Sequence, residues 1–393
     1  MSTSHQTNSE ATSHALDLPI TSLRIALVGP LPPASGGMAN QTLQLSKLLI
    51  SEGIAVELVQ VNRPYLSWVA NLKGLRALSR LFPYLYQLWR ASGNVDLVHI
   101  MANSGWSWHL YAAPAIWIAH LRGTPVIVNY RGGEAATFFE KAFAWVKPSL
   151  DKASAIIVPS GFLEIVFKKH GFMPMVVPNI IDFSRFFSLA TDLNANWVKS
   201  PRLLVARNLE LIYDNATALQ AFKIIHDAVP LARLTIAGTG PELAQLQDLT
   251  QTLDIASAVT FTGRVDNEEM PKLYHNADIM LNPTLADNMP ISILESLASG
   301  VPVVSTNVGG IPYLVQHEKT ALLVPEKNPT AMESAVLSLL NDSEQVAKLR
   351  QSGIELVSQY TWPHVRKRLM AVYANVISRN IIESSQASKG EHA

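Results

Sequence analysis

The sequence predicts an α/β protein made of two doubly wound domains, each a parallel sheet covered by helices. The chain has 393 residues, a length that suits about two domains. Short apolar strands alternate with helical segments through residues 23–186, and this alternation starts again at residue 202. The stretch between, LATDLNANWVKSPR, is polar and has no periodic pattern, as expected for a linker.

The first half begins with a strand, a glycine-rich turn and a helix. The strand LRIALVG (23–29) ends at glycine, PLPPASGG follows, and an amphipathic stretch covers 38–51. Helical segments are expected up to Leu121 and from Phe162. Further strands are expected at IAVELVQV (54–61), DLVHIM (96–101), PVIVNY (125–130) and AIIVPS (155–160). Continuous apolar strands indicate a sheet buried on both faces.

The second half repeats the pattern. Its expected strands are RLLVAR (202–207), ARLTIAGTG (232–240), AVTFTGRV (258–265), ADIMLNPT (277–284), PVVSTN (302–307) and ALLVP (321–325). Helical sequence then fills 329–359 and 362–382, and we expect disordered tails at 1–20 and 384–393. Because such sheets bind ligands at the carboxyl ends of their strands, two facing sheets predict an active-site cleft between them.

Composition excludes several function classes. Lys+Arg and Asp+Glu number 31 each, so no overall charge attracts nucleic acid, and we expect no nucleic-acid partner. The absence of cysteine excludes disulfides, thiolate zinc sites and a cysteine nucleophile, and it fits a cytoplasmic protein. No apolar run reaches the roughly 18 residues that a membrane span needs. No D-x-D pair occurs, so no metal clamp on a diphosphate is indicated.

The segment NPTLADNMPISILESLASGVPVVSTNVGG (282–310) carries the strongest chemical signal. A strand ends near Pro283, and a helix is expected from about Pro290 until Gly300 ends it. A helix N-terminus in a cleft offers unpaired N–H groups and a partial positive charge, which suit a diphosphate. Glu295 on this helix is placed to accept hydrogen bonds from a ribose diol. In the alternative interpretation Asp287 only caps the helix and Glu295 is a solvated surface residue.

This segment closely resembles the nucleotide-sugar signature of family-four retaining glycosyltransferases, which have the GT-B fold of two Rossmann-like domains facing across a cleft. The signature is glutamate, seven residues, glutamate; Asp287 takes the first position and Glu295 the second. AGTGPE, FTGRV and the tryptophan-led last helix extend the resemblance over most of 23–380. It implies an N-terminal acceptor-side domain of 21–186 plus 362–383 and a C-terminal nucleotide-sugar-binding domain of 187–361.

The resemblance also implies site residues. Arg207 matches the family's diphosphate-binding arginine, whereas the lysine usual five residues later is Ile212 here. The implied catalytic residues are Arg207, Asp287 and Glu295. The implied donor-binding residues are Gly36, Gly37, Arg207, Gly238, Gly240, Val265, Asn288, Met289, Pro290, Ile291 and Glu295. Gly238 and Gly240 do not complete the G-x-G-x-x-G fingerprint, which argues against NAD.

Acceptor-side candidates lie within or after two strands of the first half that we expect to end at the cleft: His99, Asn103, His109 and Arg131. Arg131 stands where relatives often carry a histidine near the reacting sugar. For His99 and His109 the alternative is a structural histidine inside the domain.

The segment 58–95 contains no acidic residue but carries basic and aromatic side chains. Lys73, Arg76 and Arg80 are interleaved with aromatics and with leucines at helical spacing. This pattern is typical of a helix lying on an anionic membrane surface, and equally of a helix packed on its domain with a solvated basic face.

Together these observations predict a retaining, metal-independent glycosyltransferase. We expect it to move a sugar from a nucleotide diphosphate sugar to a glycan or lipid-linked acceptor, in cell-surface polysaccharide or glycolipid synthesis. No cofactor beyond the donor substrate is expected, and the location is cytoplasmic, with peripheral attachment to the inner face of the membrane. The alternatives are a catalytically weak or inactive GT-B subunit that binds sugar nucleotides, and a non-hydrolysing nucleotide-sugar epimerase.

Overall fold

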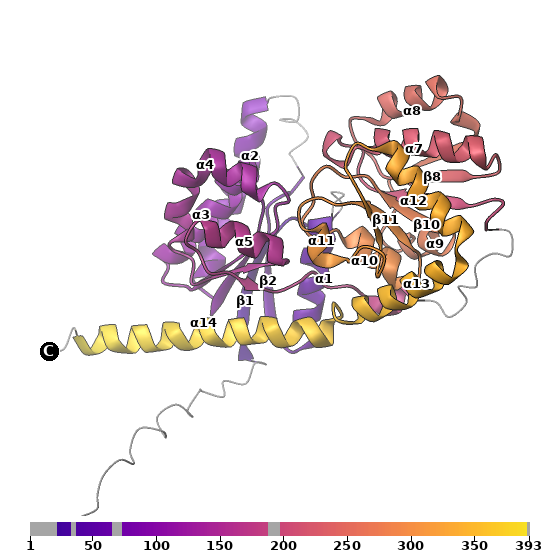
Figure 1. Cartoon of the computed structure of the whole chain (residues 1–393). Helices are drawn as coiled ribbons and strands as arrows, with labels where there is room; N and C mark the ends of the chain where they lie inside the picture. Colours follow the sequence, from indigo (N-terminus) through magenta and orange to yellow (C-terminus); the bar gives the residue numbers. More distant parts are fainter. Residues whose placement is uncertain (1–21, 33–36, 65–72, 188–196, 391–393) are drawn as a thin grey trace, which may run out of the picture.

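The computed structural model describes residues 22–32, 37–64, 73–187 and 197–390. They form two α/β domains side by side, and a long C-terminal helix runs from the second domain beneath the first (Figure 1). Gly36 and most of the predicted linker lie outside the described residues.

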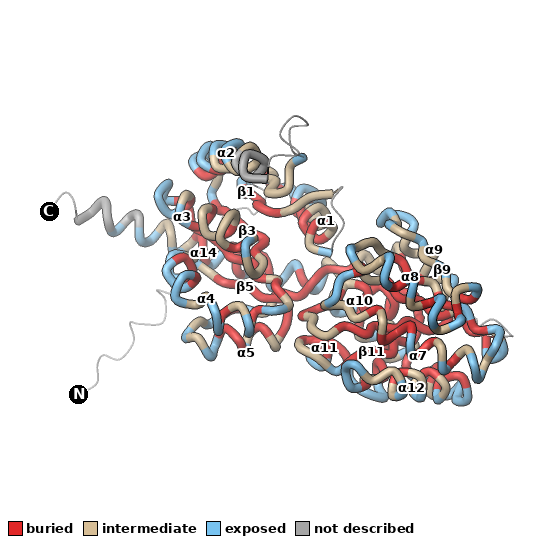
Figure 2. The backbone as a smooth tube through the Cα atoms, turned by 90° about the horizontal axis from the view of Figure 1, so that it is seen from above, coloured by how far each residue is buried: buried red, intermediate tan, exposed pale blue. Residues whose placement is uncertain are grey.

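The first domain is built on a six-stranded, fully parallel sheet with strand order β2-β1-β3-β4-β5-β6. Its strands are β1 (Arg24–Gly29), β2 (Ala55–Gln60), β3 (Leu97–Ala102), β4 (Val126–Tyr130), β5 (Ala155–Val158) and β6 (Met175–Val176). Along β1 successive side chains enter opposite cores: Ala26 and Val28 pack on one face, Ile25 and Leu27 on the other. This two-sided burial explains the continuous apolar strands (Figure 2).

Helices cover both faces of this sheet. One face carries α2 (Lys73–Ser92), α3 (Ala113–Leu121), α4 (Ala135–Leu150) and α5 (Gly161–Lys169), with the π-helix η3 (Trp108–Ala112) leading into α3. The other carries α1 (Gly37–Ser51) and α14 (Trp362–Gly390). The sequence did not predict α4 or the short strand β6.

The second domain repeats the plan with the order β12-β11-β10-β7-β8-β9, again all parallel. Its strands are β7 (Arg202–Ala206), β8 (Arg233–Ala237), β9 (Val259–Gly263), β10 (Ile279–Asn282), β11 (Val303–Thr306) and β12 (Leu322–Val324). The strand order reverses between β7 and β10, and the crevice at such a switch point is where doubly wound sheets bind ligands.

Helices again lie on both faces. One core contains α7 (Asn215–Ala228), α8 (Leu243–Thr252), α12 (Pro329–Asn341) and part of α13 (Ser343–Ser358). The other contains α6 (Phe183–Phe186), α9 (Met270–His275), α10 (Ile291–Ala298) and α11 (Ile311–Leu314). Two short 3₁₀ turns complete the domain, η4 (Leu211–Tyr213) and η5 (Ala256–Ala258).

The last helix returns to the first domain. Leu369 and Tyr373 of α14 are buried with β1 and β3, and Glu52 at the end of α1 accepts a hydrogen bond from Trp362 Nε1 at 2.8 Å. Glu52 also pairs with Arg366 at 2.9 Å. The helix continues to Gly390, so the expected disordered tail is wrong for 384–390. Because SSQASK contains neither proline nor glycine, nothing in it ends the helix before Gly390.

Candidate active site

A cleft of about 720 Å³ lies between the carboxyl ends of the two sheets. Loops after β1, β3 and β4 form one side, and loops after β7, β8, β9 and β10 form the other. We call the side made by Gln41, Asn103, Arg131 and Asn179 the N-terminal wall. We call the side made by Arg207, Asp287, Asn288, Ser292 and Glu295 the C-terminal wall. All nine residues line the same cleft.

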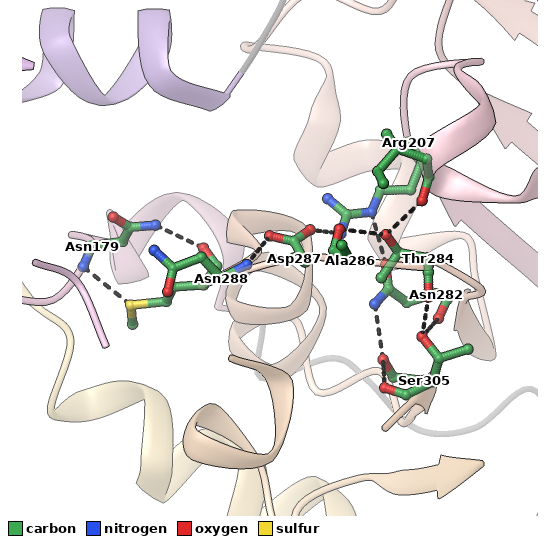
Figure 3. A network of polar contacts seen from close by, with 11 residues as sticks. Asn179, Arg207, Asn282, Thr284, Ala286, Asp287, Asn288 and Ser305 are labelled. Carbon is green, nitrogen blue, oxygen red and sulfur yellow. Dashed lines mark hydrogen bonds and ion pairs between the residues drawn. The ribbon is translucent and has the colours of Figure 1, made fainter. Parts of the chain in front are cut away.

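Arg207 lies where β7 ends, at the switch point of the second sheet. Its Nε donates to Asn282 Oδ1 at 2.7 Å, and Nη2 donates to Asp287 Oδ2 (Figure 3). The Tyr213 ring lies under the guanidinium, 4.8 Å from its centroid. Asn282 is itself oriented by donating to Ser305 on β11 at 2.8 Å. Two strands and an aromatic ring therefore fix this arginine before any ligand arrives.

Asp287 lies in the loop between β10 and α10, but it does not cap the helix. The cap position is occupied by Pro290, which offers no side-chain acceptor. The second carboxylate oxygen of Asp287 accepts instead from the Asn288 backbone N–H at 2.7 Å. The first backbone N–H groups of α10 therefore keep no side-chain cap, and this end of the helix opens into the cleft.

Two buried polar atoms beside this helix end have no partner among the described residues: Asn288 Nδ2 and Ser292 Oγ. Asn288 is otherwise held, since its Oδ1 accepts a hydrogen bond from Ser160 Oγ. Buried polar groups are rarely left without a partner, so these orphan atoms point to a ligand in this part of the cleft. The start of α1 approaches from the other wall: a Cβ at Gly37 would lie 3.5 Å from Ile291 Cγ2.

Glu295 is buried, with 8% of its surface exposed, and it lines the cleft. Its Oε2 accepts a hydrogen bond from Tyr274 Oη at 2.9 Å. Burial raises the pKa of Glu295 from 4.5 to about 7, although the Tyr274 hydrogen bond and the charges of Arg185 and Arg207 act in the opposite direction. Glu295 is therefore not the solvated surface residue of the alternative interpretation.

The N-terminal wall is held mainly by amides. Arg131 Nη2 donates to Asn179 Oδ1, and also to Gln41 Oε1 at 3.4 Å. Asn179 in turn donates through Nδ2 to the Met289 carbonyl at 2.7 Å. This contact joins the N-terminal wall to the loop that precedes α10, and Figure 3 shows Asn179 beside Asn288 of that loop.

Comparison with known proteins identifies the chain. The model described as Glycosyltransferase Family 4 matches residues 35–185, and the model described as Glycosyl transferases group 1 matches residues 195–356. Each match covers one of the two domains. The chain belongs to the group 1 glycosyltransferases of the family 4 type. This is the family that the signature around Asp287 and Glu295 resembles.

Curated relatives match over part of their length. A GDP-mannose-dependent alpha-(1-6)-phosphatidylinositol monomannoside mannosyltransferase of Mycobacterium tuberculosis is 34% identical over 161 residues, which is 39% of this chain and 42% of the relative. A D-inositol 3-phosphate glycosyltransferase of Corynebacterium urealyticum is 30% identical over 141 residues, 36% of this chain and 33% of the relative. The matched region thus spans less than half of these relatives.

Solved structures match over nearly the whole chain. Sucrose-phosphate synthase from Thermosynechococcus elongatus has a TM-score of 0.72 at 20% identity and covers 91% of this chain and 100% of its own. HepE from Anabaena, solved with UDP and glucose, has a TM-score of 0.68 at 15% identity and covers 90% and 99%. At such identities the likeness concerns the fold, and with the two parallel sheets it confirms the predicted GT-B arrangement.

Of the predicted donor residues of this family, the described ones reach the cleft with one exception. The cleft is lined by Gly37, Arg207, Gly238, Val265, Asn288, Met289, Pro290, Ile291 and Glu295. Gly240 does not line it: a Cβ there would lie 2.1 Å from the Leu209 carbonyl oxygen, so this glycine serves the close packing of two loops. Gly36 lies outside the described residues.

The acceptor-side candidates divide. Asn103 and Arg131 line the cleft, but His99 does not, and we withdraw it. His99 is fully buried, its Nδ1 is 2.8 Å from Tyr373 Oη on α14, and its Nε2 is 3.1 Å from Asn129 Nδ2. Burial and then the Arg131 charge lower its pKa to about 3, so it remains neutral. His109 packs edge-on against Phe138, which lines the cleft, without lining it itself.

The residues that contribute to the site and were not predicted include Gln41, Tyr213, Tyr274, Asn179 and Ser292. Tyr274 acts through Glu295, which lies 21 residues further along the chain, and Tyr213 acts through Arg207, to which no motif links it. Asn179 follows a two-residue strand that has no clear pattern. Ser292 lies inside the signature but was interpreted only as part of the helix.

Helix α2, which carries the candidate membrane-surface residues, buries one face against its domain and exposes another. Tyr84 and Leu88 are fully buried, whereas Phe82, Tyr86 and Trp89 are 66%, 73% and 47% exposed. The side chains of Lys73 and Arg76 lie outside those that the structure describes, and Arg80 is half-buried. The two interpretations of α2 are therefore compatible, because its inner face is a core face and its outer face carries aromatics.

Two kinds of feature are absent from the described residues. No three His, Asp or Glu side chains gather in them as a group that could hold a metal ion. No helix in these ranges combines the length and apolar character of a membrane span.

Proposed function

We propose that this chain is a retaining glycosyltransferase that moves a sugar from a nucleotide diphosphate sugar to an acceptor hydroxyl. The observation that carries the proposal is the C-terminal wall, where the fixed guanidinium of Arg207 and the uncapped start of α10 meet in one cleft. An arginine beside a helix N-terminus is an anion site suited to a diphosphate. The orphan atoms Asn288 Nδ2 and Ser292 Oγ supply further polar contacts at the same place.

In the proposed reaction the bond between the anomeric carbon and the β-phosphate oxygen breaks, and the acceptor oxygen forms a bond to that carbon. Negative charge grows on the departing diphosphate, and Arg207 with the first N–H groups of α10 stabilises it. The acceptor's proton passes to a diphosphate oxygen, which lies on the same face as the attacking hydroxyl, and the configuration is retained. Asp287 positions Arg207 in this scheme, because its carboxylate already accepts a hydrogen bond from the guanidinium.

Glu295 binds the donor ribose in this proposal. Glu295 belongs to α10 and lines the cleft, and Tyr274 donates a hydrogen bond to one of its carboxylate oxygens. An ionised carboxylate accepts two hydrogen bonds from neighbouring hydroxyl groups without rearrangement. Val265 and the preceding turn of β9 border the cleft on this wall, where a nucleobase would extend beyond the ribose.

We further propose that transfer needs no divalent metal, since Arg207 and the α10 terminus already provide positive charge for the diphosphate. Activity in excess EDTA tests this point. Retention is tested separately by the anomeric configuration of the product, read by nuclear magnetic resonance. An inverted product would leave the donor site intact and overturn the proposed geometry of attack.

The acceptor is proposed to be a glycan or a lipid-linked molecule in cell-surface polysaccharide or glycolipid synthesis. The relatives are named for phosphatidylinositol monomannoside and inositol 3-phosphate, so one of them acts on a lipid. The exposed aromatics Phe82, Tyr86 and Trp89 of α2 support reversible attachment to a cytoplasmic membrane face, because amphipathic aromatic side chains are enriched at that boundary.

A thermal-shift panel of UDP-, GDP- and ADP-sugars tests donor binding. A ligand at about 100 times its dissociation constant stabilises the folded state by roughly 2.7 kcal/mol, which is readily measured. Hydrolysis of the stabilising donor without acceptor then separates an enzyme from a binding subunit. Stabilisation without any turnover indicates the inactive subunit, and formation of an epimeric nucleotide sugar indicates the epimerase. A protein that no nucleotide stabilises contradicts the proposal.

A further inference from the structure

Arg131 is a charged residue of the cleft that the proposed donor site leaves unused. Two other arginines of the cleft have carboxylate partners: Arg207 pairs with Asp287, and Arg264 with Asp266 at 3.6 Å. Within the described ranges no aspartate or glutamate pairs with Arg131. Arg131 therefore brings a positive charge to the N-terminal wall that forms no ion pair, although Glu134 lines the same cleft.

The hydrogen bonds of Arg131 leave much of its guanidinium open. A guanidinium carries five N–H donors. Both side-chain hydrogen bonds of Arg131 start from Nη2 and end on the neutral amide oxygens of Asn179 and Gln41. The N–H groups on Nε and Nη1 have no protein acceptor among the described residues, while the residue lines the cleft. An open guanidinium edge is a bidentate receptor for a carboxylate or a phosphate.

Placing this charge here is unfavourable without a counter-ion. Burial lowers the pKa of Arg131 from 12.5 to about 10, and no nearby carboxylate opposes that shift. A half-buried cation whose side-chain partners are neutral amides is poorly compensated, so an anion that enters the cleft would be bound strongly.

The surrounding residues hold Arg131 in a fixed place. Gln41 clamps α1 to the segment after β6: its Oε1 accepts from Ile180 N at 3.0 Å, and its Nε2 donates to Ile180 O at 2.8 Å. Asn179 is tied to the Met289 carbonyl next to α10. Figure 3 shows Asn179 and Arg207 at opposite ends of the polar network, with Asp287 and Asn288 between them. Arg207 thus contacts Asp287 of the loop between β10 and α10 directly, whereas Arg131 reaches that loop only through Asn179, which donates to the Met289 carbonyl.

We propose that Arg131 binds a second anionic group of the substrate, a carboxylate or phosphate on the transferred sugar or on the acceptor, distinct from the donor diphosphate. The inference rests on the proposed function for the identity of the substrate, but the anion site stands on the residues around Arg131. It makes Arg131 a specificity residue that selects charged over neutral substrates.

The test compares Arg131→Gln, Arg131→Lys, Arg207→Gln and Arg264→Gln in the full chain. Inorganic phosphate is titrated calorimetrically into each protein, first alone and then with the best nucleoside diphosphate of the donor panel. With nucleotide present, Arg131→Gln is expected to weaken phosphate affinity by roughly 10- to 100-fold, the range of a charge-assisted hydrogen-bonded pair. It should change nucleotide affinity by less than about twofold, whereas Arg207→Gln should weaken chiefly the nucleotide. Arg264→Gln is the matched control and should leave phosphate affinity unchanged.

Two results overturn the inference. Unchanged phosphate affinity in Arg131→Gln means that the arginine only braces Gln41 and Asn179. A nucleotide affinity weakened as much as that of Arg207→Gln means that Arg131 belongs to the diphosphate site. If no nucleotide binds the wild-type protein, the proposed function fails, but the titration of phosphate alone still decides on Arg131. Arg131→Lys keeps the charge without the planar fork, so an intermediate affinity is expected, and it carries the test if Arg131→Gln does not fold.

Two further arms locate the anion. Nucleotide hexoses are compared with the corresponding nucleotide uronates as donors, and phosphorylated acceptors with their neutral forms. The wild-type protein should prefer the charged member of one pair, and Arg131→Gln should lose that preference. The proposal is contradicted if the wild-type protein uses the charged and the neutral member of each pair equally well and Arg131→Gln does not change this result.

Discussion

The two walls of the cleft are built in different ways. On the C-terminal wall all three charged side chains are held by protein partners: Arg207 and Asp287 by each other, Arg207 also by Asn282, and Glu295 by Tyr274. On the N-terminal wall the charged group, Arg131, is held only by neutral amides. A wall with paired charges is organised for ligand groups that are always the same, such as a diphosphate and a ribose. A wall with one open charge can be adapted to a different substrate by changing few side chains.

The largest expected effect tests the paired wall. Arg207→Ala should lower kcat by about 10²–10³-fold, because it removes a preorganised donor to charge that grows in the transition state. Donor affinity should fall much less. Steady-state kinetics with the stabilising donor measure both quantities.

Arg202→Ala is the matched control, since Arg202 begins β7, Arg207 follows the end of that strand, and Arg202 pairs with Asp278, the residue before β10. It should leave kcat unchanged. A purely KM effect of Arg207→Ala would show that the arginine binds the ground state and the transition state equally, and would remove its proposed catalytic role.

The next effect concerns Glu295. Glu295→Gln keeps the size of the side chain and an acceptor for Tyr274, but it should weaken donor binding by roughly 10- to 100-fold, because hydrogen bonds to a charged acceptor are lost. Since the pKa of Glu295 is raised to about 7, the wild-type protein must release a proton on donor binding below that pH. Its affinity should fall about tenfold per pH unit below 7, and that of Glu295→Gln should not.

The same carboxyl group predicts a stability change with a defined sign. Its folded pKa of about 7 lies above the ordinary value of 4.5, so its stabilising contribution is complete below pH 4.5 and is lost as the pH rises to 7. Without donor, Glu295→Gln should therefore be more thermally stable than the wild-type protein at pH 8, but not at pH 4. Glu269→Gln, an exposed surface substitution, is the control for this stability comparison. The proton release on donor binding is checked separately by calorimetry in paired buffers.

The sequence predicted the C-terminal wall better than the N-terminal wall for a physical reason. Asp287 through Glu295 form one continuous segment in which helix signals and polar residues occur together, and the cleft uses them in that order. Arg207, 80 residues away from Asp287, was found only because the resemblance placed it. Tyr274 and Tyr213 were missed because a tyrosine that braces another side chain leaves no local pattern.

The N-terminal wall could not be predicted in this way. Asn103, Arg131 and Asn179 follow three different strands, and only the strand order of the sheet decides which of them meet. His99 shows the limit clearly: it lies in β3, whose end borders the cleft, but its side chain is fully buried and contacts Tyr373 of α14. The alternation of side chains along a strand predicts which residues share a face of the sheet. It does not predict that Tyr373, from the last helix, contacts His99 on that face.

A smaller effect tests whether the first domain also meets a membrane. The double substitution Phe82→Ser and Tyr86→Ser removes two exposed aromatics of α2 and leaves the buried Tyr84 and Leu88 in place. It should weaken sedimentation with anionic liposomes several-fold and reduce activity on a lipid-linked acceptor, while sparing donor hydrolysis. Ile224→Ser on α7, an exposed apolar residue of the other domain, is the control. Wild-type protein that stays in the supernatant at low salt contradicts membrane binding.

The smallest expected effect tests the assignment of His99 to the core of the first domain and not to the N-terminal wall. Tyr373→Phe removes the hydroxyl that lies 2.8 Å from His99 Nδ1 and leaves the aromatic packing of α14 intact. Because a buried polar atom is left without its partner, the free energy of unfolding should fall by about 1–3 kcal/mol. Denaturant unfolding measures that loss, and kcat and both Michaelis constants of the folded variant should equal those of wild type. A change in acceptor KM without a loss of stability would return His99 to the acceptor site, because a purely structural histidine acts on the cleft only by way of the fold.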